Sequence, residues 1–211
     1  MAKTNQPLEI EIQIDGWADS FALFNVDGAK VYIHSENETN TIFSKSMVLR
    51  DEVASWWQYF YGKSFSYRND VWFLGDKEYT GKFFIVIEPN EKGASLGHFV
   101  IGKKAQIGET EAKFELKTLD FSKINQDAWG NTHIVQGKTA KYADVNVIIP
   151  TRKIDHIKKT LERASKPTLF IGDERENGFE SFVILGYYDD FTISSENFTF
   201  SQLKLSIKGV I

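Results

Sequence analysis

The four histidines are the side chains of this sequence best suited to hold a metal ion or to move protons at neutral pH. They are His34, His98, His133 and His156, and no two of them lie within four positions of each other. Metal sites built on one helix or turn need ligands that are close in sequence, and the chain has no cysteine to complete a thiolate site. We therefore predict no metal ligands, and no residue pattern indicates a cofactor.

Two short segments share part of a catalytic or nucleotide-binding motif. Ser95 and His98 lie three positions apart, but strand alternation directs them to opposite faces, and no Gly-x-Ser-x-Gly turn is present to expose a nucleophile. The triplet Gly62-Lys63-Ser64 matches the end of a phosphate-binding loop, but Trp57 stands where that motif requires its first glycine. We interpret both matches as coincidences.

The adjacent carboxylates of Asp189 and Asp190 are the remaining arrangement that suggests catalysis, because glycosidases use two acids held about 5–9 Å apart. Neighbouring residues of a strand point to opposite faces, so these two carboxylates do not easily converge on one substrate. We interpret them as a polar bend in a long hairpin. The sequence thus predicts no catalytic residues and favours a protein that is not an enzyme.

Aromatic and charged segments indicate binding more than catalysis. The segment Trp56-Trp57-Gln58-Tyr59-Phe60-Tyr61 has more rings than one buried helix face accommodates. Either some rings stack on sugars or on another protein, or the helix packs between two sheets. Residues 152–166 contain six basic and two acidic residues, and residues 173–176 are mainly acidic. These charges indicate either complementary patches for head-to-tail assembly or a solvated helix face.

The overall charge and hydropathy exclude several classes of protein. A net charge of −4 and a pI of about 5.6 argue against a protein that binds nucleic acid by neutralising phosphates. The longest apolar run has five residues, Phe83 to Ile87, whereas a membrane-spanning helix needs about 20. The N-terminal residues lack the apolar segment of a signal peptide. We expect neither membrane insertion nor secretion by a signal peptide.

Alternating or continuous apolar runs predict that most of the chain forms strands. Residues 8–14 and 111–119 alternate clearly, and residues 82–88 contain the apolar run of a central strand. Asp27-Gly28 predicts a tight turn that joins residues 21–26 to 30–34 in a hairpin, and residues 41–49 continue this meander. The other expected strands are residues 98–107, 141–149, 168–171, 179–193 and 198–210, and residues 64–67 and 71–74 are short apolar segments.

Connections between these strands are predicted in three further places. Residues 98–107 and 111–119 are expected to form a hairpin around Gly108-Glu109, and residues 120–131 read as a loop. Residues 179–193 and 198–210 are expected to form a final long hairpin. A change of apolar phase at Ser201-Gln202 predicts a bulge in its second strand.

Two segments have the apolar spacing of amphipathic helices. The first covers about residues 51–61, with Val53, Trp56, Trp57 and Phe60 on one face. The second covers about residues 152–165, follows the strand that Pro150 ends, and takes Thr151 as its expected N-cap. Its apolar face consists of Ile154, Ile157, Leu161 and Ala164. We expect both apolar faces to pack against sheets.

Together these elements predict a mainly β protein (β-rich α+β) in which antiparallel sheets form a sandwich or barrel with two flanking helices. Each half contains a strand, an amphipathic helix and a short strand, which suggests an N-terminal lobe at residues 1–120 and a C-terminal lobe at 130–211. A single domain is the alternative. The similarity of the halves is either an internal duplication or a chance match of two amphipathic helices.

The last third of the chain carries a resemblance. Gly137 to Thr151 (GKTAKYADVNVIIPT) leads into the second helix, and Lys166 to Asp173 (KPTLFIGD) follows it. Phe182 to Phe191 (FVILGYYDDF) then precedes a strand that ends with Leu205 to Ile211 (LSIKGVI). Over about residues 130–211 this order resembles small bacteriophage and prophage tail proteins, in particular minor and distal tail components. The resemblance implies a structural subunit of a tail or baseplate that assembles into a ring and has no catalytic residues.

We accordingly expect a non-enzymatic structural subunit of a phage or prophage tail, which associates with itself and with other tail proteins and binds no nucleic acid. Its expected location is the virion tail, after assembly in the bacterial cytoplasm. The alternative is a carbohydrate-binding or adhesive β-module, favoured by the many Trp and Tyr residues. A hydrolase built on paired acids is the third possibility.

Overall fold

A computed structural model describes residues 6–37, 41–50, 65–126, 129, 132–164, 166–173, 180–195 and 197–210. The protein is mainly β, and its two large sheets each contain five antiparallel strands. This confirms the prediction of a mainly β protein built from antiparallel sheets. The chain divides into two compact units, Met1–Lys104 and Ala105–Ile211, which are described separately.

The first unit contains one curled sheet and a short two-stranded ribbon. The sheet has the order β3-β2-β6-β1-β7, and β4 pairs with β5 in the ribbon. The strands are β1 (Leu8–Phe24), β2 (Lys30–Ser35), β3 (Phe43–Ser46), β4 (Val48–Arg50), β5 (Phe65–Tyr67), β6 (Val71–Glu88) and β7 (His98–Gly102). Because β6 lies in the middle of the sheet, the prediction of a central strand at residues 82–88 is confirmed.

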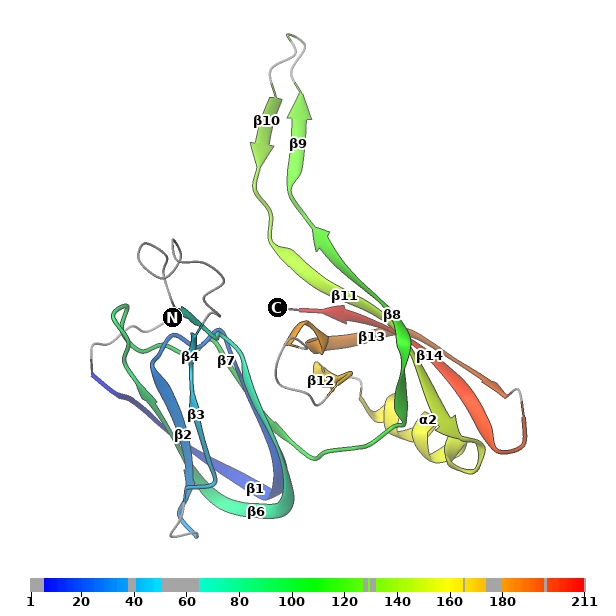
Figure 1. The fold of residues 1–211 in the computed structure, drawn as a ribbon, viewed down its shortest axis with the longest axis horizontal. Coiled ribbons are helices and arrows are strands. Elements are labelled where there is room, and N and C mark those ends of the chain that lie inside the picture. Colours follow the sequence, from blue (N-terminus) through cyan, green and yellow to red (C-terminus); the bar gives the residue numbers. More distant parts are fainter. Residues whose placement is uncertain are drawn as a thin grey trace. The chain divides into compact units, whose positions relative to one another are not determined.

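The long strands β1 and β6 bend together, so the sheet curls into a half-barrel (Figure 1). Their pairing shifts register twice, after Ile14 and again after Ala18. Gly16 and Gly81 adopt positive φ angles of 118° and 89° at this bend, a conformation that glycine reaches without steric cost. Register shifts of this kind increase the local bend and twist of a strand. The bend allows one sheet to enclose its own core.

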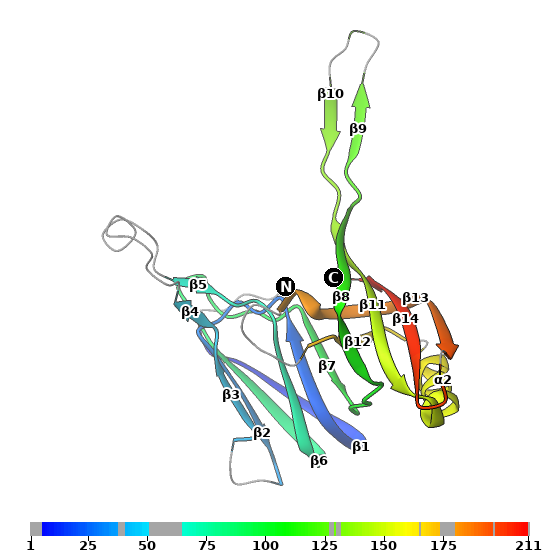
Figure 2. The same cartoon turned by 45° about the vertical axis from the view of Figure 1, so that its right-hand side comes forward.

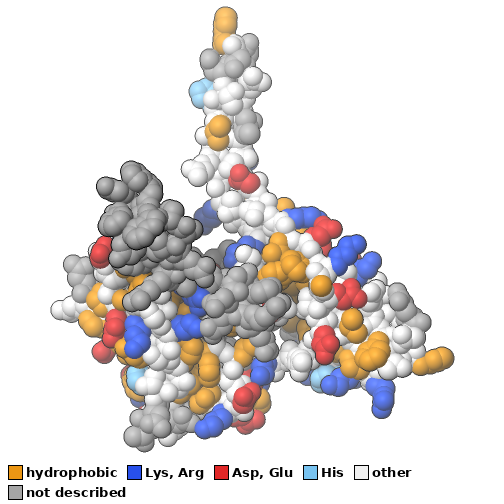
Figure 3. Space-filling view, viewed as in Figure 1, with side chains coloured by type: hydrophobic (Ala, Val, Ile, Leu, Met, Phe, Trp, Pro, Cys, Tyr) orange, Lys and Arg blue, Asp and Glu red, His pale blue; other side chains and the backbone are white. Residues whose placement is uncertain are grey.

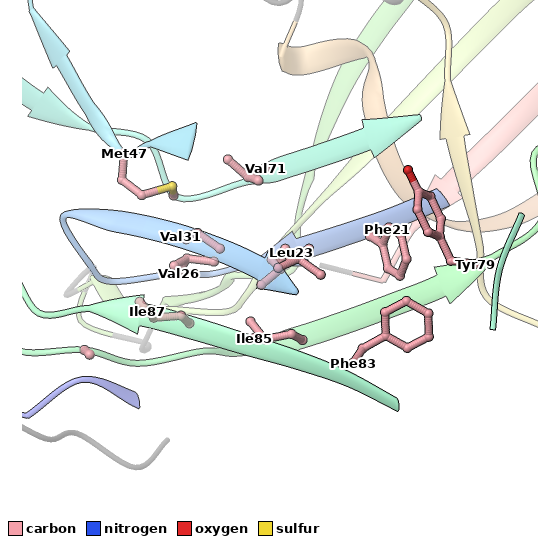
Figure 4. Packing of buried hydrophobic residues seen from close by; sticks show 12 residues of the cluster. Phe21, Leu23, Val26, Val31, Met47, Val71, Tyr79, Phe83, Ile85 and Ile87 are labelled. Atoms are coloured by element: carbon pink, nitrogen blue, oxygen red, sulfur yellow. The ribbon is translucent and has the colours of Figure 1, made fainter. Parts of the chain in front are cut away.

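The core of the first unit fills the concave side of this sheet, as Figure 4 shows. Phe21 lies at its centre, with its ring centroid 5.2 Å from that of Phe83 and 6.0–6.3 Å from those of Phe73, Tyr79 and Phe99. The other fully or nearly buried members include Leu23, Val26, Val31, Ile33, Met47, Val71, Ile85 and Ile87.

The predicted hairpin between residues 21–26 and 30–34 is wrong. Strand β1 pairs with β6 and β7, whereas β2 pairs with β3 and β6. A Cβ atom on Gly28 would lie 2.5 Å from Cγ2 of Ile87. This glycine is therefore needed because the chain passes close to β6, and not for a tight turn between two paired strands. The predicted continuation of the meander is confirmed, since β3 pairs with β2.

The last residues of the first unit are tied to the bend of β1. The backbone N–H of Lys104 donates to Oδ1 of Asp19 over 2.6 Å, and Nζ of Lys103 lies 3.9 Å from the ring centroid of Trp17. The predicted hairpin of residues 98–107 with 111–119 is wrong, because β7 pairs with β1 and the next strand pairs within the second unit. A Cβ on Gly108 would lie 2.4 Å from the carbonyl oxygen of Ile148, so this glycine permits close packing of two backbones.

The second unit contains a five-stranded sheet with the order β12-β13-β14-β11-β8 and a ribbon of β9 and β10 (Figure 2). Its strands are β8 (Glu109–Asp120), β9 (Lys123–Gln126), β10 (Thr132–Val135), β11 (Thr139–Pro150), β12 (Thr168–Ile171), β13 (Val183–Ser195) and β14 (Phe200–Gly209). Its helical elements are η1 (Thr151–Lys153), α2 (Ile154–Arg163) and η2 (Glu180–Phe182).

The helix of the second unit is close to the predicted one. Together η1 and α2 cover Thr151–Arg163, and Ile157 and Leu161 are buried in the core with strand residues such as Ile149 and Leu203. The expected N-cap is wrong. The hydroxyl of Thr151 contacts the carbonyl oxygen of Asn197 and the hydroxyl of Ser201, and thus ties the start of the helix to the β13–β14 turn.

The final hairpin of β13 and β14 is confirmed, but the bulge lies elsewhere than predicted. Pairing runs without interruption through Ser201 and Gln202, whereas the register shifts in β13 between Tyr188 and Asp190. The apparent phase change arises because Phe200 lies exposed on the face opposite the buried Leu203.

Candidate functional site

The structure leaves the four histidines in separate settings. His34 contacts the hydroxyl of Thr41 through Nδ1, and its ring lies nearly parallel to that of Tyr32. The other three lie on β7, on β10 and on the exposed side of α2. Within the described ranges, no group of three or more His, Asp or Glu side chains is arranged to hold a metal ion.

The other residues considered for catalysis are not brought together either. Ser95 is fully buried, and its hydroxyl donates to Oδ2 of Asp27, whereas His98 lies exposed at the start of β7. Asp189 lies at the bulge of β13 and has no paired residue on β14. Asp190, the next residue, pairs with Ser206. Both aspartates are exposed on the strand.

Several sequence predictions fall outside the described residues. These are the helix at about 51–61 with its apolar face, the aromatic segment Trp56 to Tyr61, the Gly62-Lys63-Ser64 triplet, and the acidic segment after Asp173. The basic segment around α2 is described, and its basic side chains are exposed. Lys158 and Glu162 form an ion pair there at 3.9 Å.

A projecting hairpin of the second unit is the feature best suited to bind another molecule. Strands β8 and β11 pair up to Asp120 opposite Thr139, and the chain continues from this end as β9 and β10 (Figure 1, Figure 2). We call residues 121–137 the arm. At a strand rise of about 3.3 Å per residue, β9 (Lys123–Gln126) alone spans about 10 Å. The prediction of a loop at residues 120–131 is wrong, because it includes β9.

Hydrogen bonds fix the base of the arm to the sheet. The backbone N–H of Phe121 donates to the carbonyl of Lys138, and the N–H of Gly137 donates to Oγ of Ser122 over 2.9 Å. Ser122 in turn donates to Oδ1 of Asp120 from both its backbone N–H and its hydroxyl, at 2.8 and 2.6 Å. These two bonds lower the pKa of the Asp120 carboxyl. Hydrogen bonds among residues 120–122, 137 and 138 therefore hold the base of the arm in place on the sheet.

Close packing of the two legs at this base requires a glycine. A Cβ atom on Gly137 would lie 2.3 Å from the carbonyl carbon and oxygen of Phe121, which are backbone atoms and cannot swing away. Every other residue type carries that Cβ atom. The sequence therefore specifies where the two legs of the arm come together.

The arm exposes large apolar side chains along its length. Phe121, Ile134 and Val135 are 54–68% exposed, and Trp129 near the tip is 90% exposed. Apolar side chains are visible on the arm in Figure 3. Isolated two-stranded hairpins are marginally stable in water, and their open edges offer unpaired backbone groups. An arm with this composition gains stability when a partner covers it.

Polar contacts on the face of the sheet opposite α2 connect the strands that carry the arm. Asp144 of β11 accepts a hydrogen bond from Oγ of Ser206 at 2.6 Å and an ion-paired contact from Nζ of Lys117 at 3.2 Å. The Ser206 bond, followed by that of Lys117, lowers the pKa of Asp144. The resulting stabilisation is present above the pKa of this carboxyl in the unfolded chain and is lost as the pH falls through its lower folded value.

Replacing Gly137 by alanine is expected to open the base of the arm while leaving the five-stranded sheet folded. The steric overlap with Phe121 predicts a loss of about 1–3 kcal/mol for closing the two legs. Hydrogen exchange should therefore be faster in β9 and β10 and unchanged in β14. The matched control is Gly102→Ala, because a Cβ at Gly102 meets no atom within 4 Å. Equal exchange of the arm in both variants would contradict this account of Gly137.

The arm was missed at the sequence level because β9 is mostly polar and reads as a loop. The β-branched residues of Thr132-His133-Ile134-Val135 were the signal for a strand, but the sequence showed no second strand with which this segment could pair. Chemically, such an arm offers a partner an apolar surface to bury and unpaired backbone groups to pair with.

Within the described parts of the chain, no helix is long and apolar enough to cross a membrane.

No protein-family profile matches the chain, and no curated protein sequence is significantly similar to it.

Proposed function

We propose that this protein is a non-enzymatic structural subunit of a phage or prophage tail or baseplate, which associates with itself and with other tail proteins. The observation that carries the proposal is the arm, whose apolar side chains and open strand edges are typical of a segment that is covered in an assembly. The order of segments over residues 130–211, which resembles that of tail proteins, supports the particular assembly. In the proposal, the protein is located in the virion tail.

The physical basis is the cost of leaving the arm in water. Burial of apolar surface stabilises an interface by roughly 25 cal/mol for each Å² removed from water. Trp is also among the residues that most often dominate binding energy. A base fixed by hydrogen bonds holds these side chains in one direction, which reduces the entropy lost when a partner binds. The arm thus combines an apolar surface with a defined attachment.

The test is to make the arm polar and to measure association of the full chain. The variant Ile134→Ser with Val135→Ser removes two exposed apolar side chains without touching the core, and Phe198→Ser is the control because Phe198 is fully exposed away from the arm. Sedimentation velocity at tens of micromolar protein should show species larger than a monomer for the wild type and the control. The arm variant should shift towards the monomer.

Two results would count against the proposal. An unchanged size distribution in the arm variant would show that the arm makes no contact in the assembly. A wild-type chain that stays monomeric and is retarded on polysaccharide would favour the carbohydrate-binding alternative. The tail assignment has its own check, because tail genes lie in clusters and this gene should have such neighbours.

A further inference from the structure

Among the residues that the structure describes, the five-stranded sheet of the second unit has an unpaired edge on each side. Strand β8 lies at one edge, with β11 as its paired neighbour. On the other side, β12 pairs with β13 only over Val183–Gly186. In the part of the chain that the structure describes, residues Tyr187–Ser195 of β13 therefore have β14 as their sole paired neighbour. Open edges of this kind are templates for pairing with another chain.

One pair of side chains on the two edges has opposite charge. The open part of β13 contains Asp189 and Asp190, and β8 carries Lys113 and Lys117 among the acidic residues Glu109, Glu111, Glu115 and Asp120. Nζ of Lys117 contacts Asp144 at 3.2 Å and Glu115 at 3.0 Å within its own copy, and its side chain remains 53% exposed at the edge. Lys117 and Asp190 lie on the same face of the sheet, because they are in register with Tyr142 and Ser206, which are both on the face opposite α2. Opposite charges directly across a strand pair stabilise it.

Apolar side chains on the other face match in the same way. Phe114 and Leu116 of β8 lie on the helix side of the sheet and remain 37% and 40% exposed, although the ring of Phe114 packs edge-on against that of Phe182, with the centroids 4.2 Å apart. At the other edge, Phe191 and Ile193 of β13 pack against the core of the second unit and are only partly buried. A strand added at either edge would cover these side chains.

We propose that β8 of one copy pairs antiparallel with β13 of a second copy, so that one sheet continues from subunit to subunit. This inference rests on the proposed function, because it assumes self-association. Each of the neighbouring strands β13, β14, β11 and β8 runs antiparallel to the next, so β13 and β8 run in opposite directions. When β13 of a second copy is placed beside β8 of the first, the antiparallel order of the sheet therefore continues into that copy. The interface is heterologous, since two different edges of identical subunits meet.

Charge and face together select one register. Placing Lys117 opposite Asp190 also places Leu116 opposite Phe191 and Phe114 opposite Ile193. A shift of one residue would put apolar side chains on the polar face. A shift of two residues in one direction brings Glu115 opposite Asp190, which is repulsive, and the same shift in the other direction leaves Lys117 opposite Thr192 without an opposite charge.

Irregularities limit the length of the pairing. The register of β8 with β11 shifts between Val145 and Val147, and β13 is irregular at Asp189. Bulges end regular pairing and blunt open edges against uncontrolled association. The regular segments that remain are Phe114–Asp120 and Asp190–Ser195, and the proposed register uses these.

A cysteine pair tests the register directly, because the natural chain contains no cysteine. The double variant Lys117→Cys with Asp190→Cys should form disulfide-linked dimers and longer ladders under mild oxidation. Within one copy, β14 and β11 separate these positions by three strand spacings, or about 14 Å, whereas a disulfide needs Cα atoms within roughly 7 Å. The matched control is Lys117→Cys with Ser194→Cys, on the same face but out of register.

The expected result is several-fold more cross-linked protein in the Lys117–Asp190 pair than in the control on a non-reducing gel. As a second measurement without cysteines, Asp190→Lys should weaken association, because it places a lysine opposite Lys117. The matched control is Thr192→Lys, which in this register faces Glu115 and should leave association intact. Equal cross-linking of both pairs in a protein that still assembles through its arm would overturn the edge pairing alone. No cross-linking in a chain that remains monomeric would overturn both this inference and the proposed function.

Discussion

Replacing Phe21 by alanine is expected to lower the free energy of unfolding of the first unit by about 3–5 kcal/mol. Phe21 is 1% exposed, and its ring contacts four other aromatic rings from β6 and β7. Its removal leaves a cavity at the centre of a curled sheet whose strands cannot move inward independently. Chemical denaturation followed by tryptophan fluorescence and circular dichroism would measure the loss.

The matched control for this experiment is Phe84→Ala. Phe84 is a phenylalanine of the same sheet but lies on its outer face and is 37% exposed. Its replacement should cost much less than that of Phe21. Because the chain divides into two compact units, the data should be fitted with two transitions. A loss below about 1 kcal/mol for Phe21→Ala would show that the core is assigned incorrectly.

Replacing Leu161 by alanine should cost about 2–5 kcal/mol in the second unit, as expected for a large-to-small change in a core. Leu161 is 1% exposed on α2 and packs in one cluster with Ile157 and with strand residues of the sheet. The control is Arg163→Ala on the exposed side of the same helix, with an expected change within about 0.5 kcal/mol. Similar losses for the two variants would mean that the helix does not bury the predicted face.

The positions of strands could be predicted from the sequence much better than their partners. Alternation at residues 8–14 and the apolar run at 83–87 depend on local burial, which side-chain type records directly. Pairing of Leu8 with Ile87 depends on the whole unit, and no local pattern encodes it. The two predicted hairpins at Asp27-Gly28 and at Gly108 failed for this reason. In both places glycine was read as a turn signal, whereas it permits a close approach to a distant strand.

The arm could not be predicted for a related reason. Apolar side chains in a strand normally indicate a core, but Ile134 and Val135 lie 68% and 58% exposed on a two-stranded projection. Sequence patterns report that a side chain favours burial, and they do not distinguish burial within the chain from burial against a partner. Only the spatial arrangement shows that the arm leaves its own sheet.

The pairing of β1 with β6 also determines when the first sheet is able to form during synthesis. The partners of Leu8 to Ile14 lie in the last residues of β6, so this strand waits until residues up to Glu88 have left the ribosome. At about 5–20 residues per second, that interval lasts several seconds. During it, the nascent strand exposes its apolar residues to other chains. Glu9 and Glu11 alternate with those residues, and charges at such positions oppose aggregation of exposed apolar strands.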